Sequence, residues 1–525
     1  MRLFLCFLIL VCLYVGLGYA SIDTAFVDEL EHLLVDTGGY NNGGFKAGVT
    51  PCSLYNQGSQ NLGRQSAAQW IRVAFHDFAT ANVALGTGGL DASIGFETNR
   101  DEDKGAAMND SLTFFAPFVN KYVSMADLIA LGVVTAVGAC SGPLIPFKAG
   151  RVDSVVAGDL GVPEEFGALS KHIEQFSRAG MNQTEMIQLT ACGHTLGSVH
   201  QAGFPDVVHN AETPDNIAGT IHLDDTFDVF DNHIAKNFIS GNITDPLVTS
   251  ENTTVRSDLR IFSSDNNATM RRLAGSDVEF FTTCTHIMSK MIDTVPKGVN
   301  LTPIYPISLK PVNIRLSIDK DGNLFLSGAI RLLSSKGFPE NTGRKVFISY
   351  NYRDGRPCRS CITEAVYDPS TNKGSSLYGD TFYHLFSVQV DTSRGISSYT
   401  RYDIQDKVIW LPELSSITDN DGQITGNLFA AVLLGSRQST TVRALLHTPQ
   451  DQYGAKNPHI EEFLIDFNAT GFISGSKYML FSSLRNVPLP IKNMTTAMRS
   501  SIDVTALIDS KVYIDDFRKL KECFP

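Results

Sequence analysis

Apolar residues recur at three- and four-residue intervals along the first half of the chain, the spacing of one face of an α-helix. The clearest segment is 124–138, where Leu128, Leu131 and Val134 follow this spacing. Segments 66–78 and 184–197 have the same character, and Asn182 or Thr184 is a suitable N-cap for the second. We therefore predict a mainly α domain over residues 21–295.

The period of the pattern changes after residues 296–311, a proline-rich stretch that breaks helices and is predicted to be a linker. Beyond it, apolar and polar residues alternate from Ile314 to Ile318, a turn follows at 319–323, and a second apolar run begins at Leu324. This pattern predicts a β-hairpin. Comparable runs occupy 345–352, 382–390, 427–434 and 441–447, so we predict an all-β, sandwich-like domain over 312–525.

The chain of 525 residues is long enough for both domains. Its formal net charge is -12, with 43 Lys and Arg against 55 Asp and Glu. The sequence has no basic stripe that could follow a phosphate backbone. Nucleic acid is therefore not expected as a partner. The acidic turns at 319–323 and 419–422 resemble partial calcium loops, but ordinary hairpin turns explain them better.

The first twenty residues have the pattern of a signal peptide. A short basic start at Met1 and Arg2 precedes an uncharged apolar run, and a small-x-small motif ends at Ala20. The run is too short to cross a bilayer. We expect cleavage after Ala20 and a secreted, extracellular, monomeric protein that has no membrane anchor once the signal is removed.

Eight Asn-x-Ser/Thr sequons are compatible with a glycoprotein. They begin at Asn109, Asn182, Asn242, Asn252, Asn267, Asn300, Asn468 and Asn493. Without the predicted signal, seven cysteines remain, and in an oxidising compartment most of them are expected to pair. An odd number leaves one thiol over, or one pair between chains. Cys358 and Cys361 form a CxxC motif, for which a structural bridge is favoured over redox or zinc chemistry.

Two of the predicted helices carry candidate catalytic side chains. Arg72 and His76 are four residues apart in the helix at 66–78, so they share one face, with Phe75 beside them. His194 lies on an apolar helix among small residues, which would allow a flat macrocycle to approach, and imidazole is the usual axial ligand of haem iron. Taken singly, each histidine is better explained as a structural residue. The combination of both helices favours a functional site.

Three motifs carry a family resemblance: RVAFHD at 72–77, GGLDAS at 88–93 and ACGHTLG at 191–197. Further blocks lie at 127–131, 150–154 and 257–259. In order and spacing they resemble the plant and fungal secretory haem peroxidase superfamily, nearest its fungal, class II-like branch, over about residues 50–295. The resemblance implies a helical haem b domain that reduces hydrogen peroxide and oxidises small organic donors.

The resemblance also assigns roles that physical chemistry supports. His76 is the expected base that moves a proton between the two peroxide oxygens, and Arg72 is a fixed cation beside the departing oxygen. His194 is the expected iron ligand, with Asp258 accepting a hydrogen bond from its second ring nitrogen. Phe75 is expected to form a wall of the pocket on the peroxide side.

Two Ca²⁺ sites are implied by the same motifs, because their ligands would be oxygen atoms. The first set is Asp77, Gly89 through its carbonyl, Asp91 and Ser93. The second set is Thr195, Asp224, Thr226, Val229 through its carbonyl, and Asp231. The first residue of each set, Asp77 or Thr195, directly follows one of the two key histidines in sequence. The ions would therefore fix both helices.

Departures from the family pattern restrict the chemistry. Asp103 stands where the family usually has an asparagine next to the base, and a carboxylate there is expected to raise the pKa of His76. Leu223 replaces the aromatic residue below the iron ligand, so a tryptophan radical there is not expected. At the positions where manganese peroxidases of this branch have their metal ligands, this chain has Gln65, Gln69 and, at about the third position, His200. Neutral amides bind Mn²⁺ poorly, so no manganese site is expected.

The surface tryptophan of ligninolytic relatives is replaced by Leu189, so we expect phenols or similar donors, oxidised at the haem edge. Cys52 with Cys140, and Cys192 with Cys284, are candidate disulfides, with other pairings open. Two alternatives remain at this stage. One is an enzyme that only removes peroxide, and the other is a non-catalytic extracellular binding protein that has kept the fold.

Overall fold

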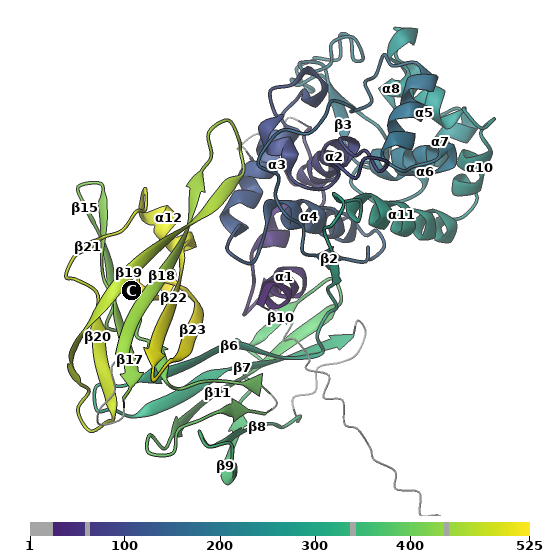
Figure 1. Ribbon diagram of the computed structural model, residues 1–525. Helices are drawn as coiled ribbons and strands as arrows, with labels where there is room; N and C mark the ends of the chain where they lie inside the picture. The colour runs from purple at the N-terminus through teal and green to yellow at the C-terminus, as the bar shows by residue number, and fades with distance from the viewer. Residues whose placement is uncertain (1–24, 58–62, 336–342, 401, 435–439, 525) are drawn as a thin grey trace, which may run out of the picture.

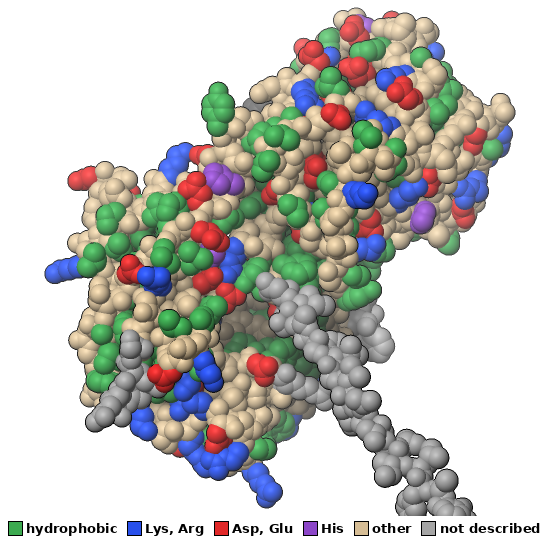
Figure 2. All heavy atoms as spheres, viewed as in Figure 1, with side chains coloured by type: hydrophobic (Ala, Val, Ile, Leu, Met, Phe, Trp, Pro, Cys, Tyr) green, Lys and Arg blue, Asp and Glu red, His purple; other side chains and the backbone are tan. Residues whose placement is uncertain are grey.

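The computed structural model describes residues 25–57, 63–335, 343–400, 402–434 and 440–524. The predicted signal peptide, 1–20, lies outside the described residues. The described chain forms a helical domain followed by a β-rich domain, which appear as two lobes in Figure 1. No helix in these ranges is long and apolar enough to span a membrane. On the face shown in Figure 2, acidic and basic side chains are interspersed over both domains.

The helical domain surrounds one large hydrophobic core. Its helices are α1 (Ala25–Val35), α2 (Ser66–Ala79), α3 (Ala107–Phe115), α4 (Met125–Ala139), α5 (Leu169–Arg178), α6 (Gln183–His194), α7 (His233–Ser240), α8 (Pro246–Thr249), α9 (Ser257–Phe262), α10 (Ala268–Ala274) and α11 (Asp277–Ile292). Two short strand pairs, β2 (Lys148–Ala149) with β5 (Thr302–Pro303) and β3 (Ser198–His200) with β4 (Thr220–His222), complete it.

The three predicted helices are present, with small shifts at their ends. Helix α4 is apolar all round and buried along nearly its whole length, and the Ser124 side chain caps its start. A capping box at Asn182 and Glu185 starts α6. This helix ends at His194, earlier than the predicted 197, because Thr195 leaves the helix and bonds to the loop around Asp231.

Two sheets begin the β domain. The first has the order β1-β10-β11-β7-β6, and the second β13-β12-β8-β9. Their strands are β1 (Gly38–Gly39), β6 (Leu309–Ile318), β7 (Leu324–Ser335), β8 (Val346–Asn351), β9 (Pro357–Ala365), β10 (Lys373–Ser375), β11 (Gly379–Val390), β12 (Ser398–Tyr399) and β13 (Tyr402–Asp403). The hairpin predicted at 314–326 is confirmed by the β6–β7 pairing. Its turn is closed by hydrogen bonds within residues 319–323, as expected for an ordinary hairpin.

A seven-stranded sheet, β14-β17-β20-β19-β18-β22-β23, follows, with a three-stranded sheet, β15-β16-β21, and the short helix α12 (Met494–Arg499). The strands are β14 (Val408–Trp410), β15 (Ser416–Asn420), β16 (Gln423–Asn427), β17 (Phe429–Leu433), β18 (Thr440–Asp451), β19 (Pro458–Phe472), β20 (Tyr478–Ser482), β21 (Val487–Pro488), β22 (Ser501–Ile508) and β23 (Lys511–Lys519). The edge strands β14 and β23 meet where the main-chain N–H of Trp410 donates to the Asp515 carboxylate (2.7 Å), so the large sheet curls around its core.

The two domains are joined by buried ion pairs as well as by the chain. Helix α1 places Glu31 and Asp36 against Arg331 of β7, and Lys310 of β6 lies 2.7 Å from Glu31. All four charged side chains are buried. Removing one partner of such a cluster leaves a buried charge unpaired, so these contacts hold the domains in one arrangement.

Candidate functional site

A cavity of about 270 Å³ opens between α2 and α6 in the helical domain. Arg72, Phe75 and His76 line it from α2, while Gly193 and His194 line it from α6. The structure therefore brings the two predicted catalytic helices to opposite walls of one space, although they are more than 100 residues apart in sequence. We call the α2 wall the distal wall and the α6 wall the proximal wall.

Arg72 is held on the distal wall by its guanidinium, which donates to the Lys104 carbonyl (2.8 Å) and lies over the Phe204 ring (5.5 Å to its centroid). Burial lowers the pKa of Arg72 to about 10. The side chain is still a cation at neutral pH. It can therefore stabilise negative charge that develops on a ligand in the cavity.

His76 is buried and its Nδ1 lies 2.7 Å from Asp103 Oδ1. Asp103, in a short 3₁₀ turn, is thus the side chain that faces the predicted base. The predicted direction of the pKa shift is wrong: burial and the charge of Arg72 hold the pKa of His76 well below its usual value. Burial also raises the pKa of Asp103 to about 6, which weakens its attraction for a protonated imidazole.

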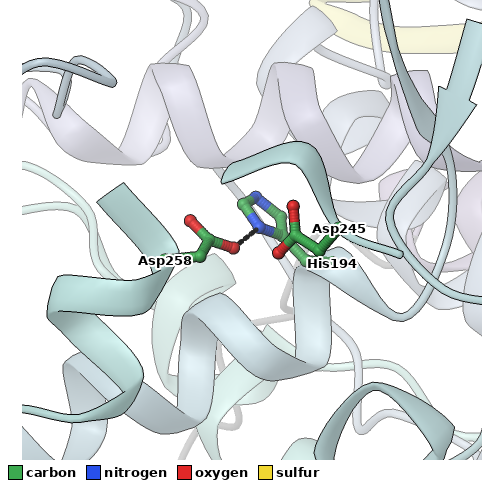
Figure 3. A group of neighbouring side chains, drawn as sticks. All are labelled: His194, Asp245 and Asp258. Atoms are coloured by element: carbon green, nitrogen blue, oxygen red, sulfur yellow. Dashed lines mark hydrogen bonds and ion pairs between the residues drawn. The ribbon is translucent and has the colours of Figure 1, made fainter. Parts of the chain in front are cut away.

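His194 on the proximal wall has its Nδ1 2.5 Å from Asp258 Oδ2, as expected (Figure 3). Burial opposes its protonation, but the charge and hydrogen bond of Asp258 outweigh it and raise the pKa of His194. Since Nδ1 is engaged with Asp258, Nε2 is the nitrogen left for a ligand in the cavity. A side chain at the neighbouring Gly193 would extend into open space, so this wall is unobstructed.

Two further side chains of the site were not identified from the sequence. His172 of α5 lines the cavity, and its Nε2 lies 3.0 Å from the Glu164 carbonyl. Asp245, which precedes α8, lies beside His194 and Asp258 (Figure 3). No sequence spacing links either residue to the two helices, so only the fold shows their position.

The first predicted calcium set gathers behind the distal wall, where Asp77 near the end of α2 meets the loop that carries Gly89, Asp91 and Ser93. Asp77 accepts hydrogen bonds from the Ala92 and Ile94 N–H groups (2.8 and 3.0 Å), and the Ser93 hydroxyl is 3.5 Å from it. Burial and the charge of Asp91 raise the pKa of Asp77 well above its usual value. Two buried carboxylates that repel each other in this way fit a bound cation, and Gly89 lies in the same loop.

The second set is gathered behind the proximal wall. The Thr195 hydroxyl donates to the Asp231 carbonyl (2.7 Å) and is 3.4 Å from Asp224. The Thr226 hydroxyl lies 3.2 Å from Asp224 and 3.0 Å from Asp231. Burial, followed by the neighbouring acids, raises the pKa of Asp224 to about 7. Val229 is in the same loop, two residues before Asp231.

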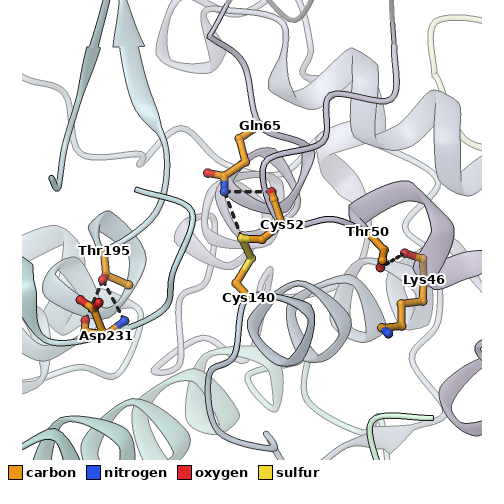
Figure 4. The surroundings of a disulfide bond; sticks show 7 residues. All are labelled: Lys46, Thr50, Cys52, Gln65, Cys140, Thr195 and Asp231. Atoms are coloured by element: carbon orange, nitrogen blue, oxygen red, sulfur yellow. Dashed lines mark hydrogen bonds between the residues drawn. A yellow bond between two sulfur atoms is a disulfide. The ribbon is translucent and has the colours of Figure 1, made fainter. Parts of the chain in front are cut away.

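Four of the positions that depart from the family pattern, Gln65, Gln69, Leu189 and Leu223, are occupied by buried side chains that carry no charge. The Gln65 amide donates to the Cys52 carbonyl (2.9 Å), as Figure 4 shows, and the Gln69 amide donates to Asp110 (2.8 Å). Leu189 and Leu223 are buried and line the cavity.

Three disulfides connect the described cysteines: Cys52–Cys140 (Figure 4), Cys192–Cys284 and Cys358–Cys361. The two candidate pairs are therefore confirmed, and the two cysteines of the CxxC motif are bridged as expected. Cys523 is the cysteine left over among the residues that the structure describes. Cys52–Cys140 fixes the loop before α2, and Cys192–Cys284 joins α6 to α11.

Residues 55–276 match the protein-family model described as Peroxidase. This region contains both walls of the cavity. Over these residues the helical region is similar to the peroxidase family. Haem is the cofactor that this family implies, and the residues present fit it: one ring nitrogen of His194 is free, the proximal wall is open at Gly193, and a base and a cation lie opposite.

Curated relatives include both peroxidases and a larger protein. A WSC domain-containing protein of Arthroderma benhamiae is 39% identical over 383 residues, covering 71% of this chain and 51% of the relative. The peroxisomal L-ascorbate peroxidase 5 of Arabidopsis thaliana is 37% identical over 142 residues, covering 26% of this chain and 50% of the relative. The mitochondrial cytochrome c peroxidase of Neurospora crassa is 32% identical over 142 residues, covering 26% of this chain and 39% of the relative.

This chain spans about half the length of the first relatives it matches. The match to the Arthroderma benhamiae protein is longer than the whole helical domain, so it extends into the β domain. At least part of the β domain is therefore shared with this relative.

Proposed function

We propose that this protein is a secreted haem b peroxidase that reduces hydrogen peroxide and oxidises small phenolic or similar donors by one-electron steps. One observation carries the proposal: a single cavity has Arg72 and His76 on one wall and the His194–Asp258 pair on the other. Peroxide cleavage needs a base, a cation and an iron ligand in this relative arrangement.

When bound, haem supplies the iron that receives peroxide and the redox equivalents that the donors replace. His76, whose low pKa keeps it neutral, takes a proton from one peroxide oxygen and returns it to the departing oxygen. Arg72 stabilises the negative charge on that oxygen. The two electrons come from two donor molecules, and two water molecules leave. Phe75 limits the entry of water beside His76.

The oxidising compartment and the two Ca²⁺ ions are also part of the proposal. Three disulfides and the signal-peptide pattern at 1–20 support export. The buried carboxylate groups behind each wall support calcium, because each group has the oxygen donors that this ion prefers. The ions would connect the ends of α2 and α6 to the loops behind them.

The test is an absorption spectrum of the purified, haemin-loaded protein before and after peroxide, followed by peroxide-dependent oxidation of a phenol such as guaiacol. His76→Leu is the test variant. The matched control is His459→Leu, because His459 is a partly exposed histidine of the β domain. We expect the first variant to bind haemin and lose turnover, and the control to retain both.

Other outcomes separate the alternatives. Consumption of peroxide without any need for a donor would indicate simple peroxide removal. Haemin binding with neither activity would favour a binding protein that keeps the fold. A protein that takes up no haemin, or full turnover in His76→Leu, would contradict the proposal.

A further inference from the structure

One hairpin of the β domain reaches the back of the distal wall. Strands β18 and β19 are joined by residues 452–457, which we call the brace loop, and the hairpin extends to the helical domain (Figure 1). The Asn457 Nδ2 group donates to the Ala92 carbonyl (2.7 Å), and the Lys456 main-chain N–H donates to the Gly95 carbonyl (2.9 Å). The brace loop is therefore bonded to segment 92–97, which lies next to Asp77.

Asn457 is almost completely buried, with 1% of its surface exposed. Its Nδ2 group bonds to Ala92, whereas its Oδ1 has no donor among the residues that the structure describes. Burying an amide with one unpaired oxygen is unfavourable, and an apolar side chain would avoid that cost. The bond from Nδ2 to Ala92 is thus the specific contribution of this side chain.

The helical domain is shaped to receive this amide. A Cβ atom at Gly95 would lie 2.4 Å from Asn457 Oδ1 and 2.5 Å from its Cγ. These distances are well below van der Waals contact, so any other residue at position 95 would displace the Asn457 side chain. The close approach of the two domains at this point therefore depends on Gly95.

The residue that Asn457 holds has a strained backbone. Ala92 is in the left-handed region, with φ 60° and ψ 19°, where residues that have a Cβ are disfavoured. In this conformation its N–H donates to Asp77 Oδ2 (2.8 Å). Its carbonyl accepts from the Gly95 N–H (3.1 Å) as well as from Asn457. Such a conformation persists only where surrounding contacts hold it, and Asn457 supplies one of them from the β domain.

Segment 92–97 is connected to His76 in two ways. Asp77, which follows His76 in sequence, accepts hydrogen bonds from the Ala92 and Ile94 N–H groups. The same stretch of chain continues to Asp103, whose Oδ1 lies 2.7 Å from His76 Nδ1. A displacement of the segment would therefore move both groups that fix the imidazole ring.

We propose that Asn457 is a positioning residue of the distal wall: through the brace loop, the β domain holds segment 92–97 in the conformation that fixes Asp77 and so orients His76. The inference rests on the proposed function, in which His76 moves the proton. Proton transfer depends on the distance and direction between the base and peroxide, so a small displacement of the ring slows the reaction. The β domain thereby takes part in the chemistry of the helical domain.

Three variants separate this role from general attachment of the domains. Asn457→Ala removes the amide. Tyr453→Ala is the matched control on the same loop, because Tyr453 is fully exposed. Lys121→Met is the second control, because Lys121 lies 2.7 Å from Asp503 and joins the two domains elsewhere. If Asn457 only attached the domains, Asn457→Ala and Lys121→Met would have the same effects.

The first readout needs no haem: it is hydrogen exchange of segment 92–97, followed by mass spectrometry. Asn457→Ala should raise the exchange rate of these amides by about tenfold, because a buried hydrogen bond is lost, and both controls should match the wild type. Gly95→Ala should have the same effect, since its Cβ displaces Asn457. In the double variant the clash is absent, so the two effects should not add.

The second readout is kinetic and uses the haemin-loaded protein. Asn457→Ala should lower the rate of the reaction with peroxide by about 10- to 100-fold, the scale of a small misplacement of a catalytic group. Haemin retention and the rate of the donor-oxidising step should stay as in the wild type, because neither depends on the orientation of His76. Tyr453→Ala and Lys121→Met should retain all three properties.

Exchange that is unchanged in Asn457→Ala, or raised equally in Lys121→Met, overturns the inference, and so do additive effects of Gly95→Ala and Asn457→Ala. Faster exchange with an unchanged peroxide rate overturns the link to His76. A protein that binds no haemin refutes the proposed function, while the exchange readout still decides whether the brace loop holds the segment. If Asn457→Ala does not fold, Asn457→Leu keeps the shape without the donor and should give the same increase in exchange.

Discussion

The two walls of the cavity present the same pair of side chains in opposite electrostatic states. On the distal wall, His76 Nδ1 lies 2.7 Å from Asp103, and on the proximal wall His194 Nδ1 lies 2.5 Å from Asp258. Yet the pKa of His76 is lowered and that of His194 is raised. A histidine–aspartate contact therefore does not by itself determine the protonation of the ring.

The surroundings of each aspartate account for the difference. Asp103 is the buried residue of its turn, and burial raises its pKa to about 6, while Arg72 adds a positive charge beside His76. Asp258 is supported by the Ser257 hydroxyl and by Asp245, and its pKa is lowered. The distal wall is thus suited to accept a proton. The proximal wall is suited to hold an imidazole in a fixed orientation and tautomer.

The comparison is tested most strongly by removing the proximal histidine. His194→Ala should lose haemin binding, because it removes the iron ligand itself. Losing only the hydrogen-bond partner of a ligand typically lowers affinity by roughly 10- to 100-fold, and the loss in His194→Ala should be larger. The measurement is a haemin titration followed by absorption. His76→Ala is the matched control and should still bind haemin, and equal loss in both variants would contradict the assignment of the two walls.

Removing the distal base should leave the cofactor in place and slow the chemistry. His76→Leu is expected to lower the rate of the reaction with peroxide by about 10²- to 10⁴-fold, because a positioned base contributes this much. Stopped-flow absorption measures that rate on protein loaded with haemin. A decrease smaller than tenfold would show that another group moves the proton.

The two aspartates should differ when each is made neutral. Asp258→Asn is expected to weaken haemin retention by about 10- to 100-fold, since it changes the partner of the iron ligand. Asp103→Asn should leave retention unchanged and alter only the rate with peroxide. Competition for haemin with apomyoglobin measures retention. Equal effects would mean that the walls have no separate roles.

Calcium should matter to both walls, but through stability. Chelation with EGTA is expected to lower the melting temperature, and an ion at 100 times its dissociation constant contributes about 2.7 kcal/mol. Asp77→Asn should weaken the distal site and Asp224→Asn the proximal one, because each replaces a carboxylate ligand. Calorimetry with and without Ca²⁺ measures the effect. No response of the melting temperature to Ca²⁺ in any of the three proteins would contradict both sites.

The smallest expected effect is a shift in pH dependence. The base must be neutral to accept a proton, so the rate with peroxide is retained above the pKa of His76 and lost as the pH falls through it. Because that pKa is lowered, the acidic limb should lie below the ordinary value of 6.5. Arg72→Leu removes a charge that lowers the pKa, so the limb should move to higher pH. A limb that moves to lower pH would contradict the electrostatic account.

The sequence by itself determined the secondary structure near the site and the identity of its main side chains. Arg72 and His76 share a helix, so their spacing alone places them on one face, and the motif around His194 supplies the opposite helix. The change from helical to alternating periodicity near residue 300 predicted the two domains. These features are local, and local spacing directly constrains which residues lie side by side.

The tertiary structure decided everything that depends on residues far apart in the chain. Asp245 meets Asp258 and His194 only because α6, α8 and α9 pack together, and no periodicity encodes that contact. Asp103 alone does not set the pKa of His76, since burial and the charge of Arg72 outweigh the effect of the carboxylate. Desolvation depends on the whole surrounding fold, so its magnitude cannot be obtained from a short sequence motif.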